Sequence, residues 1–427
     1  MPAPHDFPPS ERRSKVRKSH SIEKFDVVIA GGGPAGLSTG IVCARNGLRT
    51  LLCDKQAFPI DKACGEGIMP TGVAHLEALG VREYLDEART HLFRGVRYHA
   101  PDGRAATGVF AQGTGMGIRR IALSQALFER LRTFSSIEIR QEAPLVPLGR
   151  RPEEIEVSVG GDRILARLLV GADGMNSGIR KWAGLTERPG KLKRWGARQH
   201  FALPPWSPYV EVIWQPGVEA YITPCGGNEV GIAFLWRPER LYGVRGGEAL
   251  IPSLLSHFPW LRERLGDAPP SSRPRAVGPL HRPARDVIDE GLLLIGDAAG
   301  YLDAITGEGI SLATAEALAF EQHVVPLLTR RDPPLLSRKA LAPYRNAHRA
   351  IVSPYLRMTR LVLLLHRAPR LAERVIPALA RDPVLFTHLL EANMGRKRLS
   401  ALPARRILSF LWALSLVRSG RGNRRPG

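Results

Sequence analysis

Apolar and polar positions change their spacing several times along the 427-residue chain, and each spacing predicts a different kind of element. An apolar run, a glycine-rich turn, a helical stretch and a second apolar run occupy residues 26–55, which predicts a strand–helix–strand unit. Leu123, Leu127 and Leu131 recur at helical spacing, so an amphipathic helix is expected over residues 121–133. Apolar runs on either side of Gly160 and Gly161 predict a pair of strands.

The pattern becomes shorter and alternating between residues 190 and 275, which is typical of an antiparallel sheet. Four short strands are predicted there, at residues 197–203, 209–214, 219–223 and 229–235. Another strand pair is expected over residues 93–111, around the turn Pro101-Asp102-Gly103. From Leu335 onward the chain has the pattern of helices broken by prolines.

The strand–helix–strand unit carries glycines at GxGxxG spacing. Gly31 permits a tight turn, Gly33 leaves room for a pyrophosphate, and Gly36 lets the helix pack closely on the sheet. The helix that begins near Pro34 directs free N–H groups toward the phosphates, and Asp54 ends the second strand where a carboxylate accepts hydrogen bonds from a ribose. The predicted dinucleotide-binding positions of this unit are Gly31, Gly33, Pro34, Ala35, Gly36, Asp54 and Lys55.

Three further segments indicate which dinucleotide is bound. An apolar strand ends at Gly296-Asp297, and Thr306-Gly307-Glu308-Gly309 then opens an alanine-rich helix. A second Asp-Gly pair, Asp173-Gly174, follows the strand at residues 164–170. The third segment is the stretch Lys62-Ala63-Cys64-Gly65-Glu66-Gly67.

Together these segments resemble the FAD-dependent monooxygenase superfamily that includes para-hydroxybenzoate hydroxylase, with geranylgeranyl reductases and flavin halogenases as relatives. The resemblance implies non-covalent FAD, with Asp297 bonded to the ribityl chain and Gly296 in the turn before it. It also implies that Gly307 and Gly309 bring backbone N–H groups to the flavin N1–C2=O edge. A helix N-terminus at that edge would stabilise the negative charge of reduced flavin.

The resemblance assigns roles to four more residues. The Lys62–Gly67 stretch is similar to the geranylgeranyl reductase branch, where Lys62 would neutralise the FAD pyrophosphate. Cys64 would face the isoalloxazine as the one candidate catalytic residue, or else it is a small packed side chain. Arg120 lies where relatives carry an arginine near the FAD phosphates, with Arg119 as the competing assignment. Asp173 either supports the flavin site or caps the helix that follows.

The predicted fold class is therefore α/β, with a Rossmann-like FAD-binding domain, an inserted antiparallel β-sheet substrate domain and a C-terminal helical segment. The expected organisation, in residue numbers, is a disordered basic tail (1–20), the first part of the FAD-binding domain (21–190), the substrate domain (191–272), the second part of the FAD-binding domain (273–334) and the helical region (335–427).

Charge changes this picture mainly at the C-terminus. The formal net charge is +21, and residues 396–427 hold nine Lys/Arg and no acid. Residues 407–417 are nearly all apolar between Arg405, Arg406 and Arg418, yet a bilayer span needs about twenty residues. This segment either docks on the fold as a last helix or makes weak peripheral contact with an anionic membrane. No nucleic-acid-binding motif accompanies the charge, so we expect no nucleic-acid partner.

The four cysteines, Cys43, Cys53, Cys64 and Cys225, have neither metal-site spacing nor a disulfide framework. We therefore expect no metal, and the reducing cytoplasm is the expected compartment. The first twenty residues lack the apolar core of a signal peptide.

These features predict an FAD-dependent oxidoreductase acting on a small, apolar or aromatic molecule. No second GxGxxG follows a strand, so NAD(P)H would visit the flavin from the surface, or a reductase partner would supply electrons. The leading expectation is a monooxygenase that hydroxylates or epoxidises its substrate through a flavin C4a-hydroperoxide. The alternative is a geranylgeranyl-reductase-like reductase of prenyl or polyene double bonds, and a non-catalytic flavoprotein sensor is a third class. The strand at 219–224 lacks the tryptophans that halogenases carry there, which argues against halogenation.

Overall fold

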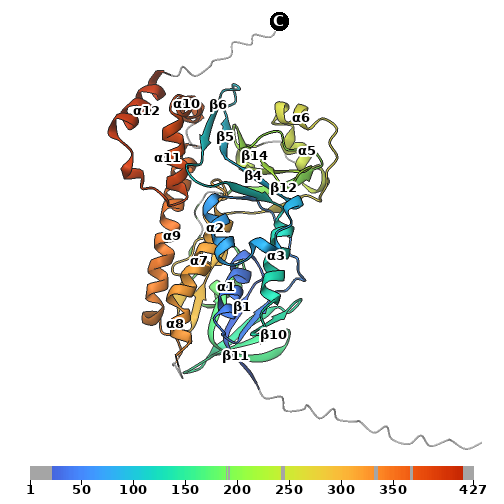
Figure 1. The fold of residues 1–427 in the computed structure, drawn as a ribbon, viewed down its shortest axis with the longest axis vertical. Helices are drawn as coiled ribbons and strands as arrows, with labels where there is room; N and C mark the ends of the chain where they lie inside the picture. The colour runs from blue at the N-terminus through green and yellow to red at the C-terminus, as the bar shows by residue number, and fades with distance from the viewer. Residues whose placement is uncertain are drawn as a thin grey trace, which may run out of the picture.

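The computed structural model describes residues 22–188, 190, 193–241, 246–330, 335–365 and 369–416. The expected disorder of residues 1–20 concerns a segment outside these ranges, as does the end of the apolar C-terminal stretch at Val417. Within the described ranges, one half of the molecule is built on a mainly parallel sheet and the other on a mainly antiparallel sheet, with the C-terminal helices along one side (Figure 1).

The first half has the expected dinucleotide-binding architecture. Its strands follow the spatial order β17-β18-β11-β1-β2-β8, and β1 pairs in parallel with β11 and β2. Val27, Val28 and Ile29 are completely buried, as expected for a continuous apolar strand inside a parallel sheet. The strands of this sheet are β1 (Glu23–Ala30), β2 (Thr50–Cys53), β8 (Ile137–Arg140), β9 (Leu145–Arg150), β10 (Ile155–Val159), β11 (Asp162–Gly171), β17 (Ile288–Asp289) and β18 (Leu292–Leu294).

Helices α1 (Pro34–Arg45), α3 (Arg120–Arg132) and α7 (Gly309–His323) pack together beside this sheet. The predicted helix at residues 121–133 is therefore confirmed as α3, and Leu123, Leu127 and Leu131 are buried as its spacing requires. Shorter helices complete this half at α2 (Pro70–Ala78), α4 (Gly178–Trp182) and α8 (Val325–Leu328).

The second half is a seven-stranded sheet that contains the four predicted strands and three more. Its strands are β5 (Gly95–His99), β6 (Ala105–Val109), β12 (Trp195–Phe201), β13 (Val210–Gln215), β14 (Val218–Pro224), β15 (Val230–Trp236) and β16 (Arg275–Val277), in the order β16-β12-β15-β14-β13-β5-β6. Helices α5 (Leu250–Leu255) and α6 (Pro259–Leu265) pack beside it.

The hairpin β5–β6 corrects the sequence-based placement of residues 93–111. That placement put the hairpin in the first part of the FAD-binding domain, whereas β5 pairs in parallel with β13 of the seven-stranded sheet. Strand β16 likewise lies beyond residue 272. A hairpin forms from local signals, but the sheet that it joins depends on contacts more than a hundred residues away. A small third sheet, β3 (Gly67–Ile68), β7 (Gly115–Ile118) and β4 (Thr90–Phe93), connects the two halves.

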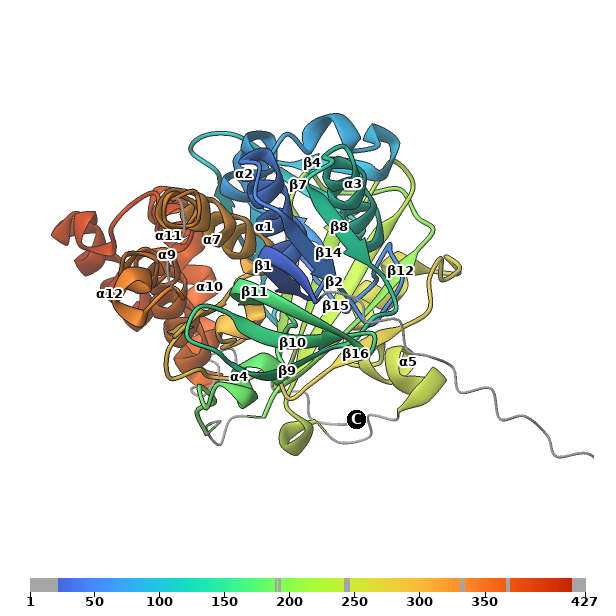
Figure 2. The ribbon, with the colours of Figure 1, turned by 90° about the horizontal axis from the view of Figure 1, so that it is seen from below.

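The C-terminal region is helical as predicted, but the prolines do not all end helices. Helix α9 (Arg338–Leu365) continues for 28 residues through Pro343 and Pro354. It runs along the side of the molecule from α7 to a group formed by α10 (Pro369–Ala380), α11 (Pro383–Asn393) and α12 (Ala404–Leu416). This group packs against β6 of the seven-stranded sheet, and Figure 2 shows all four helices on the same side.

Candidate active site

The glycine loop between β1 and α1 is shaped by two different requirements. Gly31 has φ +111°, and a Cβ there would lie 2.4 Å from the carbonyl oxygen of Ala172. A Cβ on Gly36 would lie 1.8 Å from the carbonyl oxygen of Gly31, so both positions need glycine for packing. Gly33 differs, because its Cβ would meet only Arg120 Nη2, at 4.0 Å. The space beside Gly33 is therefore open for a phosphate.

Asp54 stabilises this loop with its carboxylate. Its Oδ2 accepts a hydrogen bond of 2.7 Å from the backbone N–H of Gly32, and its Oδ1 accepts one of 2.8 Å from Gln56. Each oxygen has a second lone pair, so these bonds leave acceptor capacity for a ribose hydroxyl. The ribose contact itself stays a prediction.

Arg120 is the strongest indication of an anion site in this part of the structure. Its side chain is 3% exposed, and neither Nη1 nor Nη2 has a partner among the described residues. Burial lowers the pKa of this guanidinium, because the charged form is poorly solvated. Arg119, the competing assignment, instead forms an ion pair of 3.5 Å with Glu229. A buried guanidinium with free donors beside Gly33 fits a pyrophosphate well.

Lys62 and Asp297 lie near the same space. Enclosure lowers the pKa of the Lys62 ammonium, and the nearby Arg120 charge lowers it further. Asp297 lies just beyond β18, and burial raises the pKa of its carboxyl while Lys62 and Arg120 oppose the rise. A ligand hydroxyl that donates to Asp297 would replace part of the lost solvation.

The two carboxylate oxygens of Asp173 have different surroundings, and each corresponds to one of the two predicted roles. Its Oδ2 caps α4 by accepting hydrogen bonds from the N–H groups of Gly178, at 2.7 Å, and Ile179, at 3.2 Å. Its Oδ1 is buried without a partner among the described residues. Arg180 then joins this segment to the Asp297 turn, since its Nη1 donates to the carbonyl of Ala298 at 2.8 Å. The capping role is observed, and the ligand contact stays a prediction.

The turn before α7 borders the same cavity, and the N–H of Gly307 donates to the carbonyl of Ala304 at 3.0 Å, so the contact of this turn with the flavin stays a prediction. Gly307 has φ +70°, a conformation that favours glycine, and a Cβ on Gly309 would meet nothing within 4 Å. Between them, Glu308 is buried and accepts a hydrogen bond of 2.9 Å from Asn393 Nδ2 of α11. Burial raises the pKa of the Glu308 carboxyl to about 7. The C-terminal helices therefore help to hold the predicted flavin-binding turn, a role that the sequence motifs did not indicate.

Cys64 lies in the cavity lining on the loop before β3. Its Sγ accepts a hydrogen bond of 3.4 Å from the N–H of Glu66. Burial and then the Glu66 charge raise the pKa of the thiol, so the sulfur is protonated at neutral pH. A neutral thiol is a poor nucleophile, so these surroundings do not favour nucleophilic attack by Cys64.

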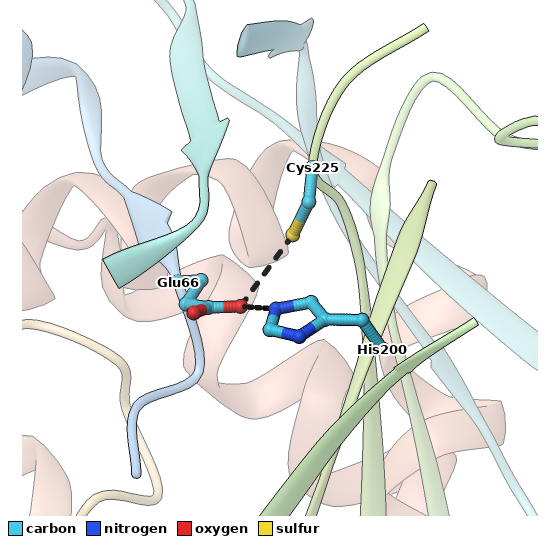
Figure 3. Close-up of side chains that lie close together, drawn as sticks. All are labelled: Glu66, His200 and Cys225. Carbon is cyan, nitrogen blue, oxygen red and sulfur yellow. Dashed lines mark hydrogen bonds and ion pairs between the residues drawn. The ribbon is translucent and has the colours of Figure 1, made fainter. Parts of the chain in front are cut away.

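Glu66, two residues further on, is the centre of a buried network that sequence reasoning missed (Figure 3). Its side chain contacts the His200 ring, the Cys225 thiol at 3.7 Å and the Arg198 guanidinium at 3.3 Å. His200 is in turn 2.8 Å from Ser272 Oγ through Nδ1. His200 and Cys225 lie 134 and 159 residues from Glu66 along the chain, so no local spacing could reveal the cluster.

The donor atoms of Glu66, His200 and Cys225 lie within 4.8 Å of one another, close enough for a metal ion. Their chemistry favours hydrogen bonding instead. Burial and the Glu66 charge hold the pKa of the Cys225 thiol well above its usual value, so the thiol keeps its proton. Glu66 is already paired with Arg198. The network joins the loop that carries Cys64 to strands of the seven-stranded sheet. It thereby holds the Cys64 thiol in place in the cavity lining.

A second buried group supports the opposite wall. Arg194 bridges Glu219, at 2.9 Å, and Asp303, at 3.2 Å. The Tyr221 hydroxyl lies 2.7 Å from Glu219 Oε2 and 3.0 Å from the carbonyl of Ile305. The aromatic face of Tyr221 is thereby held against the cavity by polar contacts behind it.

These residues border one continuous cavity of about 1130 Å³. Every predicted site residue lines it except Gly36, which lies behind the loop in packing contact. Beyond the glycine loops, the cavity extends between the seven-stranded sheet and helices α9 to α12. Its walls there are almost entirely apolar, with Val210, Val212 and Trp214 on one side and Val362, Phe386 and Phe410 on the other. We call this extension the apolar arm.

The comparisons agree with the geometry. A family model described as an FAD binding domain matches residues 24–231. A menaquinone reductase of Mycolicibacterium smegmatis is 27% identical over 314 residues, covering 67% of this chain and 73% of that protein. Digeranylgeranylglycerophospholipid reductase 2 of Methanopyrus kandleri is 25% identical over 317 residues, with the same coverage. A 3-demethoxyubiquinol 3-hydroxylase of Escherichia coli is 26% identical over 310 residues, covering 67% and 76%.

A solved flavoprotein/dehydrogenase from Cytophaga hutchinsonii shares the fold, with a TM-score of 0.76, 18% identity, and coverage of 87% of this chain and 93% of that one. The fold, the site and these matches define an FAD-dependent oxidoreductase. Residues 24–231 thus match the FAD binding domain family, and the matched relatives include both named reductases and a named hydroxylase.

Proposed function

We propose that this protein is an FAD-dependent reductase that saturates a carbon–carbon double bond in a long-chain isoprenoid lipid. The observation that carries the proposal is the apolar arm, which leads from the cofactor-binding turns to the far side of the C-terminal helices. Transfer of apolar chain from water into such a space is worth about 0.8 kcal/mol per methylene. A long hydrocarbon chain would therefore gain more from this cavity than a small aromatic ring would.

The polar groups of the site suit this chemistry. Reduced FAD supplies a hydride when it is bound. The Cys64 thiol lines the same cavity, and its raised pKa keeps a proton on the sulfur at neutral pH. That proton is available to the carbon next to the one that gains the hydride, so hydride and proton together would saturate the double bond, and the Cys64 thiolate left behind would be reprotonated before the next turnover. The Glu66 network would keep the thiol at a fixed position, and the apolar walls would exclude water.

Two of the matched relatives carry the names menaquinone reductase and digeranylgeranylglycerophospholipid reductase, which supports a prenyl-lipid substrate. Hydroxylation, the leading expectation from the sequence, is the second candidate, because a 3-demethoxyubiquinol 3-hydroxylase matches at a similar identity. The electron donor would be NAD(P)H visiting from the surface or a partner reductase.

The test is product analysis by mass spectrometry with the purified holoprotein and isoprenoid lipids of different chain length. Reduction adds two hydrogens for each double bond and proceeds without oxygen once the flavin is reduced. Hydroxylation adds one oxygen atom and requires O₂. Turnover that depends strictly on O₂, with oxygen in the product, would exclude the reductase proposal in favour of the second candidate.

A variant in the apolar arm examines the role of the cavity. Val375 lines the arm from α10, and Val375→Phe would shorten the space available to a chain. We expect a larger loss of turnover for long chains than for short ones, with FAD binding unchanged. The short-chain substrate serves as the internal control for folding and cofactor content.

A further inference from the structure

The outer face of the C-terminal helices carries exposed apolar side chains where they would be costly in water. On α12, Leu408 is 66% exposed, Leu411 55% and Trp412 67%. The opposite side of the same helix is also apolar, since Phe410 and Leu414 pack into the protein core. Docking on the fold therefore uses only one side of α12, and the second apolar side faces outward.

The exposed side continues onto neighbouring helices. Leu361 and Leu364 at the end of α9 and Leu371 at the start of α10 are 43%, 59% and 38% exposed. Helices α9 and α12 both contact α10, and Figure 1 shows α10 and α12 together at one corner of the molecule. We define the portal face as Leu361, Leu364, Leu371, Ile407, Leu408, Leu411 and Trp412.

Three members of the portal face, Leu361, Leu371 and Ile407, also line the cavity. They are at the same time among the exposed large apolar side chains. The end of the apolar arm therefore reaches the surface within the portal face. An apolar molecule that entered there would pass from one apolar environment into another.

Charge around the portal face is strongly positive. Residues 335–416 contain fifteen Lys/Arg and only three acids, Glu373, Asp382 and Glu391. Glu391 is buried, and Asp382 is paired with Arg406 at 2.6 Å. The exposed Arg357, Arg360 and Arg405 have no ion-pair partner within the described part of the chain. This excess of cations complements an anionic surface.

We propose that the portal face docks on an anionic phospholipid bilayer, with the apolar side of α12 in the headgroup–acyl boundary and the mouth of the cavity toward the lipid. No helix in the described ranges is long and apolar enough to cross a membrane. A helix with an exposed apolar side and cationic flanks instead lies in the interface plane, where tryptophan is favoured. The identity of the molecule that enters the cavity through the portal face rests on the proposed function, whereas the docking itself does not depend on it.

A second copy of this chain is a less suitable occupant. In a symmetric dimer the same surface meets itself, so the arginines around one portal face would approach those of the other. Such like-charge contacts are unfavourable when desolvated, whereas anionic headgroups neutralise them.

The test is vesicle co-sedimentation with the full-length holoprotein, comparing phosphatidylcholine vesicles with vesicles that also contain phosphatidylglycerol. We expect binding to the anionic vesicles that weakens as salt rises, because surface charges are screened beyond about 8 Å at 0.15 M. The double variant Leu408→Ser with Leu411→Ser should bind at least about tenfold more weakly. Neither residue lines the cavity.

Two matched variants serve as controls. Val146 and Leu148 on β9 are exposed at 56% and 47%, so Val146→Ser with Leu148→Ser removes a comparable, slightly smaller apolar surface elsewhere. This control should bind vesicles as the unchanged protein does. The charge variant Arg357→Gln with Arg360→Gln should lose roughly tenfold or more in binding to anionic vesicles and little in binding to neutral ones.

Absence of vesicle binding at low salt, or equal loss in the β9 control, would overturn the proposal. So would a dimer in gel filtration that Leu408→Ser with Leu411→Ser dissociates, because the face would then be a protein interface. Turnover of a detergent-solubilised substrate separates the two proposals. The portal variants should keep this turnover. If the unchanged protein binds vesicles but shows no turnover at all, the proposed function is contradicted and the docking proposal is not.

Discussion

Removal of the Arg120 guanidinium is the sharpest test of the cofactor site. The substitution Arg120→Met keeps the length and apolar stem of the side chain but removes the two Nη groups that have no partner among the described residues. The backbone N–H of Arg120, which donates to Glu66 Oε1 at 2.7 Å, is unaffected. The loop geometry should therefore survive while the anion-binding donors are lost.

The expected magnitude follows from the number of lost bonds. A hydrogen bond to a charged group contributes about 1.5–3 kcal/mol, and two such bonds to a pyrophosphate would contribute about 3–6 kcal/mol. The variant no longer contains the buried Arg120 cation that the phosphate would neutralise, and this difference offsets only part of the lost bond energy. We expect the affinity for FAD to fall by about 2–4 kcal/mol, which is roughly 30- to 1000-fold.

The apoprotein should respond in the opposite direction. Burial lowers the pKa of Arg120 despite the nearby acids, so the charged side chain is poorly accommodated when no anion is present. Arg120→Met should leave the free energy of unfolding of the apoprotein unchanged or raise it. At saturating FAD, the stabilisation by the cofactor should be smaller by the same amount of about 2–4 kcal/mol, read through the ligand dependence of Tm.

The assay is FAD titration by flavin fluorescence, combined with thermal unfolding of the apoprotein and the FAD-saturated protein. Arg119→Met is the matched control, since Arg119 is the adjacent residue and pairs with Glu229. Its affinity for FAD should stay close to that of the unchanged protein. The reasoning fails if Arg120→Met binds FAD within about threefold of the unchanged protein, or if Arg119→Met loses as much.

Four further outcomes are expected. Asp297→Ala should weaken FAD binding roughly ten- to a hundred-fold through loss of a charged acceptor, which the same titration would measure. Gly33→Val should fold but purify without FAD because its Cβ has open space, whereas Gly36→Val should fail to fold against the carbonyl 1.8 Å away; circular dichroism and flavin absorbance distinguish the two. Cys64→Ser should keep the flavin spectrum and change turnover or the product pattern, and an unchanged enzyme would make Cys64 a packing residue. Burial raises the pKa of Glu316 to about 8, so the contribution of its neutral carboxyl to folding stability is present below pH 4.5 and is lost as pH rises to 8. Between these pH values, Tm should fall less in Glu316→Gln than in the unchanged protein.

The sequence could predict those parts of the site whose geometry is local. A strand, a glycine turn and a helix occupy some thirty residues, so the spacing of Gly31, Gly33 and Gly36 already dictates the shape of the loop and the direction of its N–H groups. The same holds for Asp297 and the turn at Gly307. The FAD-binding class and the α/β fold followed from these segments.

Tertiary structure decided everything that depends on pairing between distant segments. Arg119 and Arg120 are chemically identical neighbours, and only the packing of α3 determined which guanidinium is buried with free donors. Glu66 and His200 are separated by 134 residues, and no sequence pattern links them. The hairpin β5–β6 has an unambiguous turn, yet its partner sheet is set by contact with β13.

The C-terminal helix shows the same limit in another form. Its sequence is apolar on both sides, so helical periodicity could not tell which side packs on the protein and which faces outward. The position of α10 decided that Phe410 lies inside and Leu411 outside. A local sequence encodes the shape of an element, but the neighbour that each face meets is determined only when the whole chain has folded.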